Sequence, residues 1–194
     1  AMLYYQPQIW CSDNTDAVNR LKIQYGTSFA YPISSMEAHV SVCPNHITGR
    51  SVPFSTRGIT AMDGMFGYEL DPTKLTPEEK EMCREQIRFY KKYYKTIMDG
   101  DYYRLSSPYE NQYFTAWQHV SQDQKKSLVS IVVTDKEGND AQRFLKLRGL
   151  KEDAFYRIEG WRGKYSGKIL MNAGIPVPFE LGEYEGIQLG LKMI

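Results

Sequence analysis

The stretch PQIWCSDNTDAVNRLKIQYG, residues 7–26, decides how the first half of this chain folds. An apolar, aromatic run ends abruptly at Ser12 and Asp13, and apolar residues at helical spacing follow it. That order predicts a short, buried strand that leads directly into a helix. A bare carboxylate at the end of such a strand needs an explanation, because burial disfavours the charged form.

The helix that follows carries its own start and stop signals. Either Asn14 or Thr15 is a suitable N-cap, and Asp16 would then lie in the first turn, where the helix dipole favours negative charge. Gly26 is a suitable C-cap. We expect Asp16 to stabilise the helix start rather than to contact a ligand.

The strand–helix alternation repeats twice more before residue 100. A second strand, a short glycine-punctuated helix, a third strand ending in carboxylates and a long helix are predicted in the segments MEAHVSVCP (36–44), RGITAMDGMFG (57–67), MFGYELD (65–71) and TPEEKEMCREQIRFYKKYYKTIMDG (76–100). The first part of the chain therefore has the order βαβαβα.

The pattern changes at Gly100. Residues 101–194 contain short strand-like runs, among them YSGKILMNAG (165–174), separated by turn signals such as SPYENQ and KEGND. This spacing is typical of an antiparallel β-sandwich. We therefore place a domain boundary between residues 1–98 and residues 101–194.

The βα part is not a complete sheet domain. Parallel sheets are normally covered on both faces and contain more strands than three. Carboxylates that follow the ends of parallel strands are typical of the catalytic rim of an enzyme barrel. We interpret residues 1–98 as the last three βα units of a (β/α)₈ barrel, followed by the sandwich.

Composition sets outer limits on function. A formal net charge of +1 gives no electrostatic reason to expect nucleic acid or an anionic membrane as a partner. His39 and His46 lie seven residues apart without a third ligand nearby, so neither a metal nor a cofactor is expected. Three widely spaced cysteines form no disulfide framework, and we expect a reducing, cytoplasmic environment.

Several segments together resemble glycoside hydrolase family 36 alpha-galactosidases. The likeness rests on PQIWCSDNTDAVNRLKIQYGTSFAYP, AHVSVCPNHITGR, TRGITAMDGMFGYELD, FYKKYYKTIMDGDYYRLSSP and LMNAG, which occur in the family's order and cover nearly the whole chain. The resemblance implies a retaining hydrolase that removes terminal alpha-D-galactosyl residues from raffinose-type oligosaccharides. It also implies that this chain is the C-terminal part of such an enzyme.

In that family the sixth barrel strand ends in W-x-S-D-x-T-D, whose first aspartate is the general acid/base. This position is Asp13 here. A proton donor needs a raised pKa, and apolar neighbours such as Ile9 and Trp10 would provide it. Trp10 and Cys11 are our candidates for substrate contacts. From the residues alone, the competing interpretation is that Asp13 only caps the following helix.

Two parts of the family pattern are missing, and two positions depart from it. The K-W-D-x-N nucleophile motif and the C-x-x-G-x-x-R substrate loop do not occur here, so we expect the chain alone to be inactive. Glu37 replaces a usual glycine, and Cys43 stands where valine is common. The alternative function is a non-catalytic carbohydrate-binding or structural sandwich with a barrel remnant. Exposed sheet edges predict a homo-oligomer, or association with the rest of the barrel.

Overall fold

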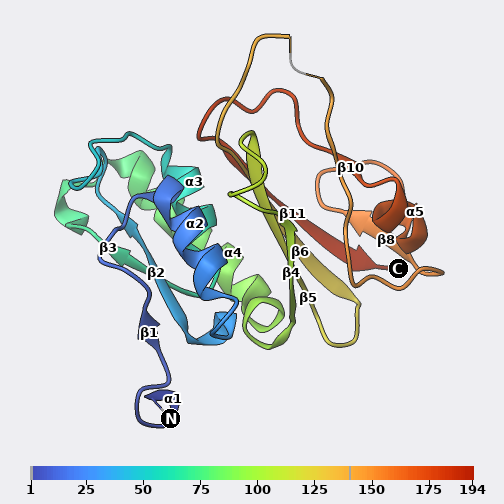
Figure 1. The fold of residues 1–194 in the computed structure, drawn as a ribbon, viewed down its shortest axis with the longest axis horizontal. Coiled ribbons are helices and arrows are strands. Elements are labelled where there is room, and N and C mark those ends of the chain that lie inside the picture. The colour runs from blue at the N-terminus through green and yellow to red at the C-terminus, as the bar shows by residue number, and fades with distance from the viewer. Residues whose placement is uncertain (1, 140) are drawn as a thin grey trace. The chain divides into compact units, whose positions relative to one another are not determined.

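The computed structural model describes residues 2–139 and 141–194 (Figure 1). The chain divides into two compact units, residues 1–94 and residues 95–194, and the long helix α4 (Pro77–Asp99) contains the point of division.

The first unit contains a parallel sheet. Its strands are β1 (Ile9–Trp10), β2 (Met36–Ser41) and β3 (Met65–Glu69), in the order β1-β2-β3. Both pairings are parallel, with Trp10 opposite Glu37 and His39 opposite Gly67. The parallel directions expected for three consecutive strands of a barrel are confirmed. β1 and β3 each have one neighbour in this sheet, which leaves both as edge strands.

Helices connect these strands in the predicted order. They are α1 (Met2–Tyr5), α2 (Ala17–Thr27), the 3₁₀ turn η1 (Ile33–Ser35), α3 (Phe54–Ala61), the 3₁₀ turn η2 (Pro72–Lys74) and α4. α1 forms in the tyrosine-rich segment that leads to β1, and the short strand predicted just before Ser12 is confirmed as β1. β2 begins at Met36, opposite Ile9, so residues 2–5 have no strand beside them and satisfy backbone groups in a helical turn.

One face of this sheet packs against helices. Ala38 and Val40 of β2 form a buried cluster with Phe54 and Ala61 of α3, and Met82 of α4 packs against it. Because side chains alternate along a strand, Glu37 and His39 project from the opposite face, and both are only partly buried. In a closed barrel the helix-free face is the inside.

The second unit is an antiparallel sandwich. Its main sheet has the order β4-β5-β6-β11-β8-β9, and a separate two-stranded ladder pairs β10 with β7. The strands are β4 (Asp101–Ser106), β5 (Phe114–Val120), β6 (Lys126–Val133), β7 (Phe144–Leu145), β8 (Phe155–Ile158), β9 (Tyr165–Ser166), β10 (Ile175–Pro176) and β11 (Gly186–Met193). All of these pairings are antiparallel.

The second layer of the sandwich differs from the sequence prediction. YSGKILMNAG was expected to be a strand, but α5 (Gly167–Asn172) forms there, with Ser166 as its N-cap. The Ser166 hydroxyl accepts a hydrogen bond from the Ile169 backbone N–H at 3.2 Å. Leu170 of this helix and Ile175 of the ladder are buried in the same core cluster as the main sheet. The second layer therefore consists of a helix and a short ladder.

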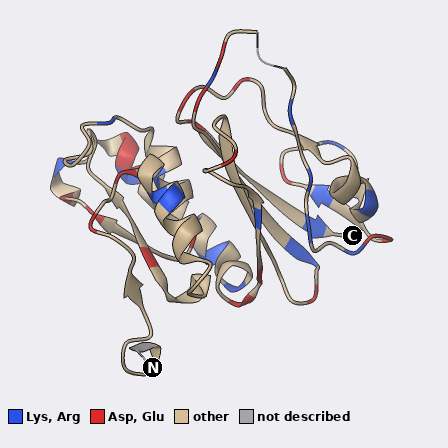
Figure 2. Ribbon diagram, in the orientation of Figure 1, with Lys and Arg blue, Asp and Glu red and all other residues tan. Residues whose placement is uncertain are grey.

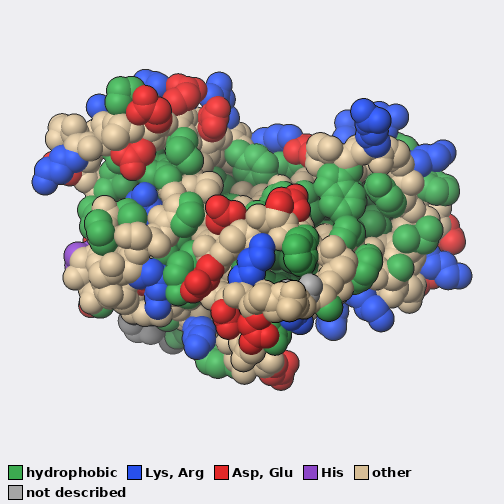
Figure 3. Space-filling model, turned by 90° about the horizontal axis from the view of Figure 1, so that it is seen from above, with side chains coloured by type: hydrophobic (Ala, Val, Ile, Leu, Met, Phe, Trp, Pro, Cys, Tyr) green, Lys and Arg blue, Asp and Glu red, His purple; other side chains and the backbone are tan. Residues whose placement is uncertain are grey.

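Charged residues of both signs are distributed along the described ribbon (Figure 2). On the face drawn in Figure 3 they intermingle with hydrophobic side chains. Across residues 2–139 and 141–194, no helix has both the length and the apolar character that a membrane span requires.

Candidate active site

Asp13 lies in the turn that joins β1 to α2, at the C-terminal end of a parallel strand. Its side chain is exposed. Among the described residues, its carboxylate makes no hydrogen bond and no ion pair. Asp13 is therefore available to a ligand, in the part of the sheet where barrel enzymes carry their catalytic groups.

The residues on either side of Asp13 are fixed by a ladder of local hydrogen bonds. The Asn14 backbone N–H donates to Ser12 Oγ at 3.1 Å, and the Asp16 backbone N–H donates to Asn14 Oδ1 at 3.0 Å. Asp16 Oδ1 then accepts from the backbone N–H groups of Val18 and Asn19. Asp16 is thus the N-cap of α2, and the prediction that Asn14 or Thr15 would hold that position is wrong.

A buried arginine fixes the backbone just before Asp13. Arg20 of α2 is 5% exposed, and its guanidinium donates to the carbonyl oxygens of Ser12 at 3.2 Å and of Glu37 at 2.6 Å. Its Nε donates to Gln24 Oε1 at 3.0 Å. One side chain therefore joins the Asp13 turn to the neighbouring strand β2.

Trp10 projects onto the helix-free side of the sheet. Its ring stacks on His39, with ring centroids 4.6 Å apart, and it remains 44% exposed. Gly67 lies on the other side of that histidine, where an added Cβ would come within 2.5 Å of His39 Cδ2. Gly67 thus makes room for the imidazole that supports the indole.

The apolar surroundings that we expected around Asp13 are not formed by the described residues. Ile9 is half-buried, while Trp10 and Asp13 are both exposed. The physical reason is the edge position of β1, which has β2 on one side and no described strand on the other.

Cys11 lies on the opposite side of the strand end from Trp10, as strand alternation requires. Burial raises the pKa of its thiol, while the nearby Arg20 and Thr27 side chains and the Glu37 backbone lower it. The thiol therefore faces α2, and its weak hydrogen bond goes to the Ile9 carbonyl oxygen at 4.0 Å.

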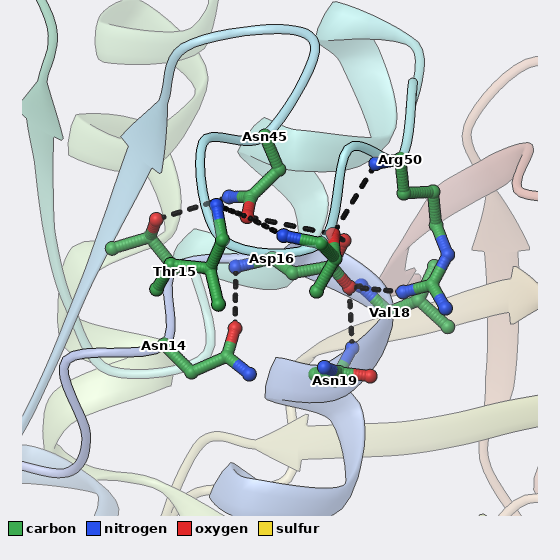
Figure 4. A network of polar contacts seen from close by, with 9 residues as sticks. Asn14, Thr15, Asp16, Val18, Asn19, Asn45 and Arg50 are labelled. Carbon is green, nitrogen blue, oxygen red and sulfur yellow. Dashed lines mark hydrogen bonds and ion pairs between the residues drawn. The ribbon is translucent and has the colours of Figure 1, made fainter.

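The loop between β2 and α3 contributes residues that the sequence analysis did not single out. Asn45, Thr48 and Arg50 surround the start of α2. Asn45 donates a hydrogen bond to Thr15 and Arg50 forms an ion pair with Asp16 (Figure 4), and the Thr48 hydroxyl donates to Asp16 Oδ2. The available signal was Asn45, because an asparagine side chain in a loop commonly accepts a hydrogen bond from the backbone two residues later. Within the described part of the chain, no three His, Cys, Asp or Glu side chains gather closely enough to hold a metal ion.

The fold and the site define a class: the last βα units of a (β/α)₈ barrel, with a candidate carboxylate at the C-terminal rim, followed by an antiparallel β-sandwich. Family comparison agrees with this division. The Melibiase family profile matches residues 1–100, and the profile of the glycosyl hydrolase family 36 C-terminal domain matches residues 114–191. The chain belongs to the melibiase family of glycoside hydrolases and carries the C-terminal domain of family 36.

Individual relatives show the same relationship. The chain is 57% identical over 187 residues to the bifunctional alpha-galactosidase/sucrose kinase AgaSK of Mediterraneibacter gnavus, covering 96% of this chain and 20% of that protein. It is 49% identical over 193 residues to alpha-galactosidase AgaA of Geobacillus stearothermophilus, covering 100% of this chain and 26% of the relative. The chain thus spans about a quarter or less of these relatives.

Solved structures agree with the fold. The galactosidase domain of AgaSK superposes with a TM-score of 0.96 at 55% identity, covering 100% of this chain and 27% of that one. Alpha-galactosidase AgaB of Geobacillus stearothermophilus also gives a TM-score of 0.96, at 49% identity, covering 100% of this chain and 26% of its own. Variants of AgaA have been solved in complex with raffinose and with stachyose.

Proposed function

We propose that this chain is the C-terminal part of a retaining alpha-galactosidase that removes terminal alpha-D-galactosyl residues from raffinose-type oligosaccharides, and that Asp13 is its general acid/base. One observation carries the role of Asp13. Its carboxylate is exposed, while Ser12, Asn14 and Asp16 around it are held by hydrogen bonds to side chains or backbone. A rigid turn that presents one free carboxylate suits catalysis better than helix capping, which Asp16 already performs.

The proposed chemistry has two steps and needs a second carboxylate. Retaining glycosidases hold their two carboxyl groups about 5–5.5 Å apart. In the first step the nucleophile, which we place in a part of the barrel outside this chain, attacks the anomeric carbon while Asp13 gives its proton to the departing glycosidic oxygen. In the second step Asp13 takes a proton from water, and the resulting hydroxide oxygen displaces the nucleophile.

The relatives support the substrate class. AgaA, which is 49% identical over the whole of this chain, has been solved with raffinose and with stachyose. We extend that substrate class to the protein that contains this chain. We also propose that the edges of the β1-β2-β3 sheet are covered by the remaining barrel strands, or by association between copies.

The test uses a fusion in which the matching C-terminal quarter of AgaA is replaced by this chain. A TM-score of 0.96 against AgaA makes the exchange structurally conservative. Turnover of raffinose and of an activated aryl alpha-galactoside is then measured for the fusion and for its Asp13→Asn variant. The isolated 194-residue chain, which we propose to be inactive without its nucleophile, is assayed in parallel.

Loss of a general acid removes about 10²–10⁴-fold in rate where the leaving group needs a proton. We therefore expect Asp13→Asn to reduce kcat/KM for raffinose by that order and kcat/KM for the aryl galactoside much less, because an activated phenolate leaves in the first step without protonation. The second step, in which Asp13 is the base, is common to both substrates and does not enter that comparison. Asp71→Asn, an exposed carboxylate after β3 that caps η2, is the matched control and should change neither rate much. Equal loss of kcat/KM on both substrates in Asp13→Asn would contradict the assignment, and so would a fusion without activity.

A further inference from the structure

The carboxylate of Asp16 is the centre of a buried polar network three residues after Asp13 (Figure 4). Asp16 is 1% exposed. Its Oδ1 caps α2 and forms an ion pair with Arg50, and its Oδ2 accepts a hydrogen bond from the Thr48 hydroxyl at 2.7 Å. Helix capping uses only one of the two carboxylate oxygens, so the other contacts require a separate reason.

Those other contacts come from the loop between β2 and α3, and hydrogen bonds within the loop stabilise its conformation. Asn45 is 6% exposed, and its Oδ1 accepts from the backbone N–H groups of Ile47 at 3.0 Å and of Thr48 at 3.1 Å. The Asn45 backbone N–H donates to the Arg50 carbonyl oxygen at 2.9 Å. Thr48 and Arg50 are therefore presented to Asp16 by a closed turn that asparagine organises.

The same loop also contacts Thr15, the residue directly before Asp16. Asn45 Nδ2 donates to Thr15 Oγ1 at 3.1 Å, and the Thr15 hydroxyl donates to Ser41 Oγ at 3.0 Å. Thr15 and Ser41 are both buried. Residues 14–16 are thus fixed to the end of β2 and to the loop that follows it, on the strand neighbouring the one that leads to Asp13.

We propose that Asp16, Asn45, Thr48 and Arg50, here called the loop anchor, are positioning residues for the reaction. The loop anchor sets the place of the Asp13 carboxylate through the backbone of residues 14–16, without touching substrate itself. This inference rests on the proposed function, because it gives the loop anchor a role only if Asp13 transfers protons.

Thr48 offers the sharpest perturbation. Its hydroxyl joins the loop to Asp16, yet the residue as a whole is exposed, so replacing it creates no core cavity. Thr48→Val keeps the shape and removes the hydroxyl, which besides Asp16 also contacts Asn45 Oδ1 at 3.4 Å and the Arg50 backbone N–H at 3.3 Å; Thr48→Ser keeps the hydroxyl. Displacing a catalytic group by about 1 Å can reduce a rate by about 10²-fold. We expect Thr48→Val to lower kcat on raffinose by about 10-fold or more, with KM little changed.

The chain offers a matched control in the corresponding loop after β3. The Thr73 hydroxyl donates to Asp71 Oδ1 at 2.6 Å, which reproduces the Thr–Asp pair away from Asp13. Thr73→Val, Thr48→Val and Thr48→Ser are made in the AgaA fusion, alongside Asp13→Asn. Raffinose, an activated aryl alpha-galactoside, the pH–rate profile and the Tm are measured for each variant.

A positioning role predicts a particular pattern. Thr48→Val should lose far more activity on raffinose than on the aryl substrate and should alter the limb of the pH profile that Asp13 controls, while Thr48→Ser and Thr73→Val retain the parent behaviour. Equal loss on both substrates with a lowered Tm would make Thr48 merely structural and overturn the inference. The Asp13→Asn variant distinguishes failure of this inference from failure of the proposed function. If Asp13→Asn loses kcat/KM selectively on raffinose and Thr48→Val does not, the positioning role of the loop anchor is refuted and the proposed function stands. If Asp13→Asn loses kcat/KM equally on both substrates, the proposed function is refuted.

Discussion

Replacing Arg20 by methionine tests whether the buried guanidinium stabilises the Asp13 turn. Arg20 is 5% exposed and donates to Ser12, Glu37 and Gln24. Methionine has a similar length and no charge, so Arg20→Met removes three hydrogen bonds and leaves three acceptors facing an apolar side chain.

The expected magnitude is the difference between two large terms. Hydrogen bonds to a charged group contribute about 1.5–3 kcal/mol each, so three contribute roughly 4.5–9 kcal/mol. Desolvation of the guanidinium opposes this gain and costs several kcal/mol; the same burial lowers the pKa of Arg20 below its usual range. We expect Arg20→Met to lower the free energy of unfolding by about 3 kcal/mol.

The assay is urea unfolding of the 194-residue chain, followed by far-UV circular dichroism. That signal reports chiefly on the first unit, which contains α2, α3 and most of α4. Arg20→Lys should destabilise nearly as much as Arg20→Met, because a single ammonium group does not reproduce the planar fork that reaches two carbonyl groups.

Arg88→Met is the matched control. Arg88 pairs with Glu81 on the surface of α4, and its side chain is 68% exposed. Exposed pairs contribute about 0–1 kcal/mol, so this exchange should change stability little. A neutral or stabilising Arg20→Met would refute the reasoning, because it would show that desolvation outweighs the hydrogen bonds.

Three further predictions concern other parts of the chain. The exposed Cys43 should react with Ellman's reagent before the half-buried Cys11, whose thiol pKa is raised by burial; peptide mapping after partial reaction distinguishes them. Burial raises the pKa of Tyr68, whereas an unfolded phenol ionises near about pH 10, so stability should be full below about pH 10 and should fall above it by up to about 1.4 kcal/mol per pH unit. Tyr68→Phe should flatten that fall, and an unchanged alkaline slope would contradict it. Gly67→Ala should push the His39 ring off its stacked indole and change the near-UV circular dichroism, since the added Cβ would lie 2.5 Å from His39 Cδ2; an unchanged spectrum would show that the ring yields without moving the stack.

The order of elements in the first unit could be predicted because each strand and helix carries its own period. The N-cap of α2 could not, because residues 13–16 are all of types that cap helices, and local spacing does not distinguish among them. What selects Asp16 is its burial against Thr48 and Arg50, more than 30 positions later. Contacts across that separation leave no periodic signal in the sequence.

In the second unit the long strands could be predicted and the covering layer could not. β5 and β6 are long, apolar runs between clear turns. α5 has only six residues, which is too short to show a helical period, and its flanking glycines resemble strand boundaries. Its helical state follows from the Ser166 cap and from the burial of Leu170, and the second of these depends on the tertiary structure.

In the turn around Asp13, the residues that stabilise the fold are different from the residue proposed to carry out the chemistry. Ser12, Asn14 and Asp16 hold the turn together, while the exposed Asp13 contributes no described contact to it. A library of substitutions selected only for soluble, folded protein would therefore tolerate almost any polar residue at Asp13 and reject most changes at its neighbours. The same library selected for galactoside cleavage would be expected to admit nothing but aspartate there. The difference between the two selections, position by position, would test the proposed active site without any ligand.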